Sequence, residues 1–476
     1  HGLLVNQKTL LFQPCGSSTD SIDLCAQHGI KLCTDNGVKL LGGGVSRSSE
    51  FFTRFTSTKI EEAIQSIKDI MELEDNQICL RLLESTSGTC KVNHLYRTML
   101  PQCFGDATGI LRKELQSSLR TCLTGNSPGF GEFAYTMASL PNSKGGFGVT
   151  DPSTLEQYAF ISMFISTNEE QSILFPQLST EFPPVVEDLI NHYCENFPLT
   201  DRESIKELIK LPHKNKQKQL AMLLNSEIRS STIRDWKLNN KDDPYFHHKV
   251  LVLESATNPF TSLWQRVLPN KGLKQTMTNS EFNTICKMQL LIPIMKGGIC
   301  VECGKKADPW GYHRVTCTGT CNANHERHQI VLHAYNAVAM VAGLHPVIDA
   351  PVKCLGLKNG VVRPADLLVD GDNNIRMCAD ITVVSPFLAA VTGPFQVGKA
   401  ATDAERRKYK KNSEPCELAS YDFMACASDV LGVIPDTTYS FIKRSAKAYS
   451  ARSGKPYADC LSICCKRISF SIRLGV

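Results

Sequence analysis

The stretch CVECGKKADPWGYHRVTC brings four metal-ligand side chains together within a short segment of the chain. Cys300 and Cys303 form a Cys-x2-Cys pair, and His313 and Cys317 form a His-x3-Cys pair. A Cys-x2-Cys turn directs two thiolates at one tetrahedral ion, and a second pair three or four residues apart completes the coordination. Gly304 fits the tight turn of such a knuckle. The spacing therefore predicts a closed, structural zinc site without chemistry of its own, because four protein ligands leave no open position.

Two alternatives stay open at this point. Cys321 competes with Cys317 for the fourth ligand position. In the second alternative, Cys300 and Cys303 are thiols of the core and His313 is a surface imidazole, because twenty cysteines in the chain raise the chance of such a pattern.

Composition narrows the class of protein. The 476 residues predict two to four domains, and 42% hydrophobic with 21% charged residues is typical of a soluble globular protein. A net charge of +5 does not by itself indicate a nucleic-acid partner, since that requires clustered charge. The start HGLLVNQKTLLF lacks the pattern of a signal peptide, and no apolar run reaches the roughly 20 residues of a membrane span. We expect an intracellular protein with reduced thiols and no membrane partner, and, since the chain begins with His, a processed or longer parent protein.

Apolar spacing predicts helices over about 50–230. Ile60, Ile64, Ile67 and Ile70 recur every three or four residues, and Asp201 is a candidate N-cap for DRESIKELIKL. Three glycines, 42–44, are expected in a turn, since no Gly-Lys-Ser/Thr of a phosphate-binding loop follows them. The polar, charged stretch DWKLNNKDDPYFHHK, from Asp235, predicts a connector.

The last third of the chain changes character. HERHQIVLHAYNAVAMVAG predicts a helix that ends at Gly343. VVRPADLLV and IRMCADITVV are β-rich and flank the turn-forming GDNN, which predicts a hairpin. GKAATDAERRKYKKN has helix propensity throughout. This order of elements predicts a small α/β domain.

A carboxylate pair follows from that hairpin. If its turn is centred near Asn373, Asp366 and Asp380 lie opposite each other on one face of the sheet. Like charges in this position are destabilising, and a divalent metal such as Mg²⁺, held by oxygen ligands, is a common reason for them. In the alternative, the turn lies elsewhere and one aspartate is solvated.

A basic helical segment follows the aspartates. It contains Lys399, Arg406, Arg407, Lys408, Lys410 and Lys411. The ordinary interpretation is a solvated helix face. Its position just after the acids favours a role at a phosphate instead.

Together these motifs resemble the C-terminal end of non-LTR retrotransposon proteins. The matching residues are Cys300, Cys303, His313 and Cys317, then Arg327-His328, Arg363-Pro364-Ala365-Asp366 and Asp380-x-Thr382-Val383. Such proteins carry a CCHC zinc knuckle followed by a restriction-like endonuclease of the PD-(D/E)xK type. GLLVNQKT resembles the segment just after the catalytic Asp-Asp motif of the reverse transcriptase, and GVKLLGGGVS, DNQICLRLL, HLYRTMLP and LPNSKGGFGV resemble its thumb region. The resemblance spans nearly the whole chain.

The resemblance implies an α+β multidomain fold. Its parts are the end of a palm-like region (1–50), a helical, reverse-transcriptase thumb-like region (51–234), a linker (235–299), the zinc knuckle (300–325) and a C-terminal α/β restriction-endonuclease-like domain (326–476).

It also implies roles for residues. Asp366 and Asp380 match the acids that bind Mg²⁺ or Mn²⁺, and Asp349 matches an upstream acid. Thr382 stands where a PD-(D/E)xK strand carries lysine, so the catalytic lysine is expected on the following helix, with Lys408 the first choice and Lys399 the second. Glu405 is within reach of the same metal. Nucleic-acid contacts are expected from Arg327, His328, Arg363, Arg406, Arg407 and Lys410.

The implied function is a Mg²⁺- or Mn²⁺-dependent DNA endonuclease that nicks a strand to prime reverse transcription, in a nuclear protein with DNA and RNA as partners. The Asp-Asp polymerase motif belongs before Gly2, so this chain alone is not expected to polymerise DNA. It would be a fragment, a decayed copy or a domesticated remnant. The first alternative is a non-catalytic RNA- or DNA-binding remnant of such a protein, and the second is a purely structural zinc protein.

Overall fold

The protein divides into two compact units that are interleaved along the chain. The computed structural model describes residues 10–11, 23–24, 26–33, 36–174, 182–211, 213–319, 321–349, 365–371, 375–391 and 396–476. Unit 1 comprises His1–Leu73, Leu82–Ser118 and Val149–Ser231, and unit 2 comprises Glu74–Arg81, Leu119–Gly148 and Thr232–Val476. The described part is a mixed α and β structure, mostly helical with small sheets, which confirms the expected fold class at that level. No helix in these ranges is long and apolar enough to cross a membrane.

Unit 1 is helical apart from short strand pairs. Its elements are β1 (Leu10–Leu11), β2 (Lys31–Leu32), β3 (Gly37–Leu40), β4 (Gly43–Ser46), α2 (Ser49–Met71), the short helices η1 (Leu83–Ser87), η2 (Thr89–Lys91) and η3 (Pro101–Cys103), α4 (Asn93–Thr98), most of α5 (Ala107–Thr124), α7 (Pro152–Leu174), α8 (Pro184–Cys194), α9 (Arg202–Lys210) and most of α10 (Lys216–Asn239). The helices expected over about 50–230 are therefore confirmed.

Local chemistry explains where these elements begin. The Ser48 hydroxyl accepts a hydrogen bond from the backbone N–H of Phe51 and so caps α2. Along α2 the predicted isoleucine stripe faces inward, with Ile60, Ile67 and Ile70 buried. The helix α9 begins after Asp201 as predicted, although the Asp201 side chain makes no capping hydrogen bond.

The glycine-rich stretch forms a tight β-turn. β3 and β4 are an antiparallel pair joined through Leu41 and Gly42, with φ of 48° and 91°. Gly42 thus lies in the left-handed region that favours glycine, as the turn prediction requires. Gly43 and Gly44 belong to β4.

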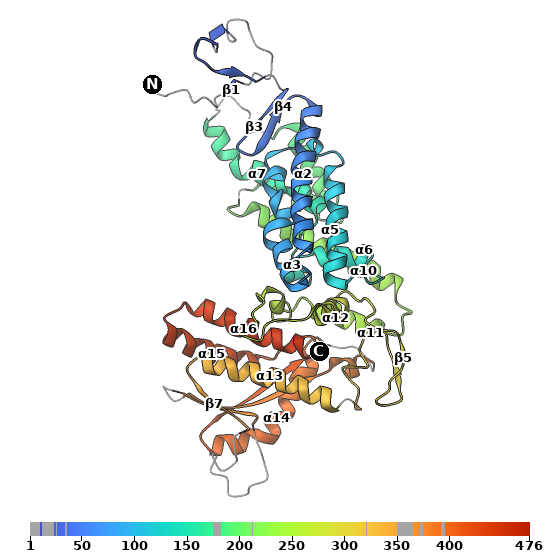
Figure 1. Ribbon diagram of the computed structural model, residues 1–476, viewed down its shortest axis with the longest axis vertical. Helices are drawn as coiled ribbons and strands as arrows, with labels where there is room; N and C mark the ends of the chain where they lie inside the picture. Colours follow the sequence, from blue (N-terminus) through green and yellow to red (C-terminus); the bar gives the residue numbers. More distant parts are fainter. Residues whose placement is uncertain are drawn as a thin grey trace. The chain divides into compact units, whose positions relative to one another are not determined.

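Unit 2 contains the remaining elements. They are α3 (Asn76–Leu82), α6 (Glu132–Ser139), η4 (Asn142–Lys144), α11 (Phe246–Ser255), η5 (Leu263–Arg266), α12 (Asn279–Gln289), β5 (Gly298–Ile299), β6 (Lys306–Ala307), α13 (Cys321–Val341), β7 (His345–Ile348), β8 (Leu367–Gly371), β9 (Ile375–Val384), η7 (Pro386–Val391), α14 (Lys399–Leu418), β10 (Asp422–Asp429), α15 (Asp436–Ser453) and α16 (Tyr457–Leu474) (Figure 1).

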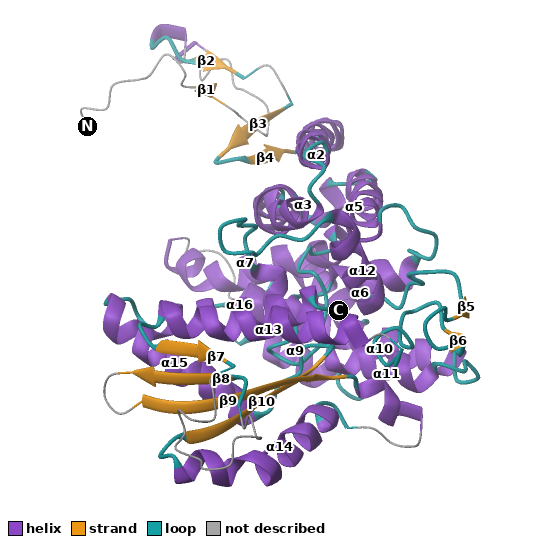
Figure 2. Ribbon diagram, turned by 60° about the horizontal axis from the view of Figure 1, so that its bottom comes forward, coloured by secondary structure: helices purple, strands orange, loops and turns teal. Residues whose placement is uncertain are grey.

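A four-stranded mixed sheet organises unit 2. Its order is β10-β9-β8-β7, with β9 and β10 parallel and the other neighbours antiparallel. The sheet lies between α14 on one side and α13 and α16 on the other (Figure 2). Side chains alternate between these layers: Leu367, Met377 and Ala379 pack with α13, α15 and α16, whereas Leu368 and Cys378 pack with α14. Burial of large apolar side chains, at about 1.5–3 kcal/mol each, holds the layers together.

The predicted hairpin is confirmed with its register. Leu367 pairs with Ala379 and Gly371 pairs with Ile375, so the connection is centred where the sequence predicts it. The expected helices on either side are α13, with Gly343 in the left-handed conformation after its last residue, and α14. Neither β7 nor β10 follows from the hairpin pattern alone.

The segment 235–299, which was expected to be a linker, contains helices. The helix α10 extends through Asn239, and α11, η5 and α12 follow it, with Trp264 buried. The charged residues of this segment lie at the surface or form ion pairs. Lys249 is buried because its ammonium lies 3.6 Å from the centre of the Trp310 ring and 2.6 Å from a carboxylate oxygen of Asp243.

The end of α13 yields a stability test. Gly343 has φ of 78°, and a Cβ there would lie 2.6 Å from Cδ of Arg452, whose guanidinium donates to the carbonyls of Met340 and Val341. Gly454 has φ of 70° and open space around its Cα. We expect Gly454→Ala to lower the free energy of unfolding by about 1 kcal/mol, and Gly343→Ala to lower it further because Arg452 must move. Urea unfolding followed by circular dichroism measures both, and equal losses would contradict the role of Arg452.

Candidate metal centre and carboxylate site

The predicted zinc ligands converge. The ligand atoms of Cys300, Cys303, His313 and Cys317 all lie within 4.8 Å of one another. The Sγ atoms of Cys300 and Cys317 are 3.8 Å apart, and Sγ of Cys303 is 3.3 Å from Nε2 of His313. The donor set of three sulfurs and one imidazole is that of a structural zinc site. These four residues can therefore hold a metal ion, as the spacing predicts.

The local fold explains this convergence. β5 and β6 pair around the first two cysteines, and the N–H of Gly304 donates to the carbonyl of Cys300 at 2.8 Å. Gly304 has φ of 70°, which suits glycine at the tip of the knuckle. Backbone N–H groups of Cys303 and Glu302 lower the pKa of the Cys300 thiol to about 6, and His313 adds to this. The turn thus favours the thiolate of Cys300. At Cys303 a hydrogen bond from the backbone of Lys305 is outweighed by burial and the neighbouring thiols, and the pKa is raised.

Asp308 positions the histidine ligand. Its buried carboxylate accepts hydrogen bonds from the backbone N–H groups of Trp310, Tyr312 and His313, at 2.9, 3.1 and 2.6 Å. These bonds fix the loop between the two ligand pairs. The Asp308-Pro309 step fits the return loop of a knuckle by sequence, and a short polar residue before a turn is the usual signal of such bonds.

The knuckle is part of the core of unit 2. Tyr312 and Val315 pack with Phe387, which follows β9, and with Val430 and Leu431, which follow β10. The ring centres of Tyr312 and Phe387 are 4.6 Å apart. The knuckle is thereby connected by packing to the ends of β9 and β10.

Asp366 directly precedes β8 and is held by three groups. Its backbone N–H donates to the carbonyl of Ala379 at 3.1 Å. Its Oδ2 accepts from the backbone N–H of Ile381 at 2.8 Å and lies 3.1 Å from Nε2 of His328 on α13.

Asp380 lies in the middle of β9 and faces α14. Oδ1 accepts from Nζ of Lys408 at 2.8 Å, and Oδ2 accepts from Nδ2 of Asn412 at 2.7 Å. The Asp380 side chain is only 3% exposed, whereas the Lys408 side chain that reaches it is 34% exposed. Of the two lysines considered from the sequence, Lys408 is the one that contacts Asp380, whereas Lys399 is an exposed first residue of α14.

The pKa values of Asp366 and Asp380 are shifted in opposite directions. Burial raises the pKa of Asp366, but the hydrogen bond and charge of His328 outweigh it, and the pKa is lowered. Burial also raises the pKa of Asp380, and the charge of Asp366 adds to this effect against Lys408 and Asn412, so the pKa is raised. The hydrogen bond to Asp366 raises the pKa of His328. This divergence is typical of carboxyl pairs at functional sites.

The remaining predicted residues have varied positions. The backbone N–H of Asp349 donates to the carbonyl of Asp366 at 2.9 Å, and its side chain is exposed. Arg406 is exposed and pairs with Asp403, and Arg407 and Lys410 are exposed on α14. Arg363 and the alternative zinc ligand, the Cys321 side chain, lie outside the described part.

The position of Arg327 differs from the expected one. A nucleic-acid contact was expected from it, but its side chain is buried and Nε donates to the carbonyl of Gly475 at 3.0 Å. Burial lowers its pKa. Arg327 therefore holds the end of α16. Because Gly475 lies far along the chain from Arg327, no local sequence pattern predicts this contact.

Asn412 was missed in the sequence. It lies one helical turn after Lys408, so both side chains are on the same face of α14 and reach Asp380. The four-residue spacing from Lys408 is the sequence signal that would have identified Asn412. Glu405 is on this face too, and its Oε1 is buried without a hydrogen-bond partner in the described part of the chain.

Comparison with known proteins gives no relative. Neither the protein-family models nor the curated proteins searched contain a match to this chain.

The ligand set can be tested by metal content. We expect the purified protein to hold one zinc ion per chain, measured by inductively coupled plasma mass spectrometry, and Cys317→Ser to lose it, because three ligands remain. Cys321→Ser is the matched control and should retain zinc. The reverse result would assign the fourth position to Cys321.

The histidine–aspartate pair predicts a pH dependence. Because the folded pKa of His328 is raised, the pair stabilises the fold fully below the unfolded value of 6.5 and loses this contribution as pH rises through the folded pKa. The stability difference between wild type and His328→Gln should therefore be larger near pH ~6 than near pH ~9. Exposed His333, on the same helix, provides the control His333→Gln. Urea unfolding at both pH values measures this, and a pH-independent difference would contradict the pairing.

Proposed function

We propose that unit 2 contains a divalent-metal-dependent DNA endonuclease. One observation carries the proposal: Asp366, directly before β8, and Asp380, in the neighbouring strand β9, lie close together in the hairpin, and the ammonium of Lys408 is 2.8 Å from Asp380. Two acids with an adjacent lysine are the groups that metal-assisted cleavage of a phosphodiester requires.

The donor set fits a hard cation. Carboxylate oxygens are the ligands that Mg²⁺ and Mn²⁺ prefer. Glu405 offers a further buried oxygen without a hydrogen-bond partner among the described residues. When bound, such a cation supplies a Lewis acid and activates water.

The neighbouring side chains would divide the remaining work. His328 and the N–H of Ile381 hold Asp366 ionised and oriented. Asn412 fixes one oxygen of Asp380, and Lys408 contacts the other. The Lys408 ammonium would stabilise the negative charge that develops on the attacked phosphate. Lys408 on α14 would thus take the role of the strand lysine, which Thr382 on β9 replaces.

The resemblance to retrotransposon proteins supplies the biological part of the proposal. A strand nicked to leave a 3′-hydroxyl would prime reverse transcription, with DNA and RNA as partners in the nucleus. A non-catalytic nucleic-acid-binding remnant is the second candidate, because Lys408 and Asn412 between them already satisfy both oxygens of Asp380.

Nicking of supercoiled plasmid DNA tests the proposal. We expect wild type with Mg²⁺ or Mn²⁺ to nick, and Asp380→Asn and Lys408→Met to lower the rate by about a hundredfold or more, because each removes a charge at the phosphate. The matched controls are Asp403→Asn, at a half-buried residue of the same helix, and Lys399→Met, at an exposed one, and both should retain activity.

Melting temperatures of all variants, if equal to that of wild type, exclude unfolding as the cause of a lower nicking rate. Absence of metal-dependent nicking in folded wild type, together with salt-sensitive binding of DNA, would replace the endonuclease by the non-catalytic candidate. Equal rates in wild type and folded Asp380→Asn would reject Asp380 as part of the site.

A further inference from the structure

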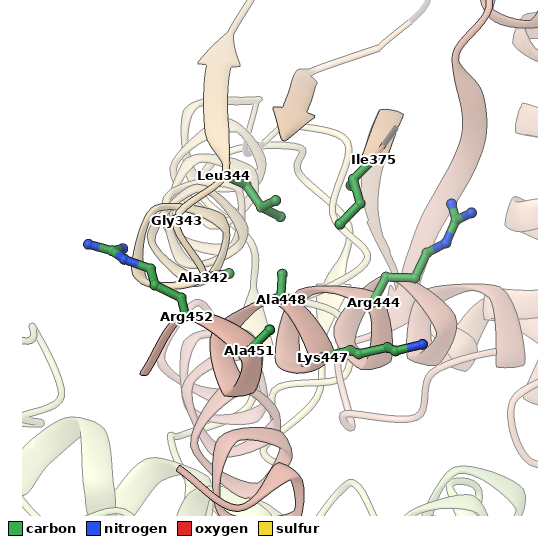
Figure 3. A pocket seen from close by; sticks show the side chains of 9 residues that line it. All are labelled: Ala342, Gly343, Leu344, Ile375, Arg444, Lys447, Ala448, Ala451 and Arg452. Atoms are coloured by element: carbon green, nitrogen blue, oxygen red, sulfur yellow. The ribbon is translucent and has the colours of Figure 1, made fainter. Parts of the chain in front are cut away.

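Two adjoining hollows lie along α15, away from the carboxylate pair. The first, of about 690 Å³, lies between the end of α13, the start of β9 and α15 (Figure 3). The second, of about 540 Å³, extends from α15 to the first residue of α16, Tyr457. Both are lined by Arg444, Lys447 and Ala451, so they flank one ridge of the same helix.

The chemistry of this surface is cationic around an apolar base. Leu344, Ile375 and Ala448 line the first hollow, and Arg444, Lys447 and Arg452 surround it. Lys443 adds a further cation to the second. No carboxylate is among the described residues that line either hollow. The surface is therefore complementary to a polyanion that also carries apolar faces.

The cations are not equally available. The Arg452 guanidinium donates to the carbonyls at the end of α13, and Arg444 pairs with Asp422 at 2.6 Å. Lys443 lies over the ring of Tyr439, with Nζ 4.4 Å from its centre. Lys447 is exposed and makes no ion pair within the described ranges. Lys443 and Lys447 are thus the cations that a ligand can engage without breaking an ion pair.

Their arrangement favours an extended ligand. Lys443 and Lys447 are one helical turn apart, about 6 Å along α15. The cationic side chains around the first hollow point outward in different directions rather than toward one point (Figure 3). A single phosphate group is usually held by converging donors, whereas cations spaced along an axis suit successive phosphates of a strand.

An exposed aromatic ring completes the set. Tyr457 is 42% exposed and lines the second hollow beside Lys443 and Lys447. Aromatic rings next to a basic track are the platforms on which unpaired bases stack.

We propose that this surface binds a single-stranded segment of nucleic acid. Lys443 and Lys447 contact successive phosphates, Tyr457 stacks on one base, and a neighbouring base occupies the apolar hollow at Leu344 and Ile375. The inference rests on the proposed nucleic-acid function but not on cleavage. Ile375 begins β9 and lies about 16 Å along the strand from Asp380, so the surface is separate from the carboxylate pair.

Binding of a fluorescein-labelled oligo-dT of about 20 nucleotides, measured by anisotropy on the full chain without added divalent metal, tests the proposal. We expect Lys443→Glu/Lys447→Glu to weaken binding about tenfold or more and to reduce the slope of log affinity against log salt by about 1.4, because two phosphate contacts are lost. Tyr457→Ala should weaken binding about tenfold at an unchanged slope, and Tyr457→Phe should restore it.

The control, Lys271→Glu/Lys274→Glu, makes the same charge change at two exposed lysines elsewhere in unit 2. It should bind as wild type. Equal weakening in both double variants would reduce the effect to net charge and overturn the site. Unchanged binding in Lys443→Glu/Lys447→Glu, or a preference of this surface for phosphatidylserine vesicles over the oligonucleotide, would also overturn it.

Discussion

The hydrogen-bonded arrangement around Asp366 and Asp380 is the constraint on which the account of unit 2 depends. Two carboxylates on neighbouring strands repel each other, and burial in a medium of low dielectric increases that cost. The surrounding groups offset it from both faces of the sheet: His328 reaches Asp366 from α13, and Lys408 and Asn412 reach Asp380 from α14. A hydrophobic pair would stabilise these strands more simply, so a chemical role is the better explanation of the acids.

The zinc-ligand cluster is connected to this arrangement through the core. Its Tyr312 and Val315 pack on residues that follow β9 and β10, and β9 carries Asp380. A metal at the knuckle would therefore support the ends of the strands that position the carboxylates, while its own closed coordination leaves it without chemistry. The knuckle is thus connected by packing to the strand that carries Asp380.

Local patterns predicted what local forces determine. Alternation and turn residues predicted the hairpin, and its register agrees with the predicted turn centre. Cysteine and histidine spacing gave the ligand cluster for the same reason. The charged stretch from Asp235, by contrast, predicted a connector, because charge in the sequence does not reveal tertiary contacts. Lys249 of this stretch is buried against Trp310, and the segment contains helices. Arg327 owes its burial to Gly475, and the interleaving of the two units has no signature in any short window.

The central claim is that the paired carboxylates form a site for a hard divalent cation. Electron paramagnetic resonance of Mn²⁺, titrated into the zinc-loaded protein, measures this directly and without any substrate. The account predicts a bound Mn²⁺ in wild type and in Asp403→Asn, competed by Mg²⁺, and its loss in Asp366→Asn and Asp380→Asn. Identical Mn²⁺ binding in wild type and in both folded site variants would contradict it.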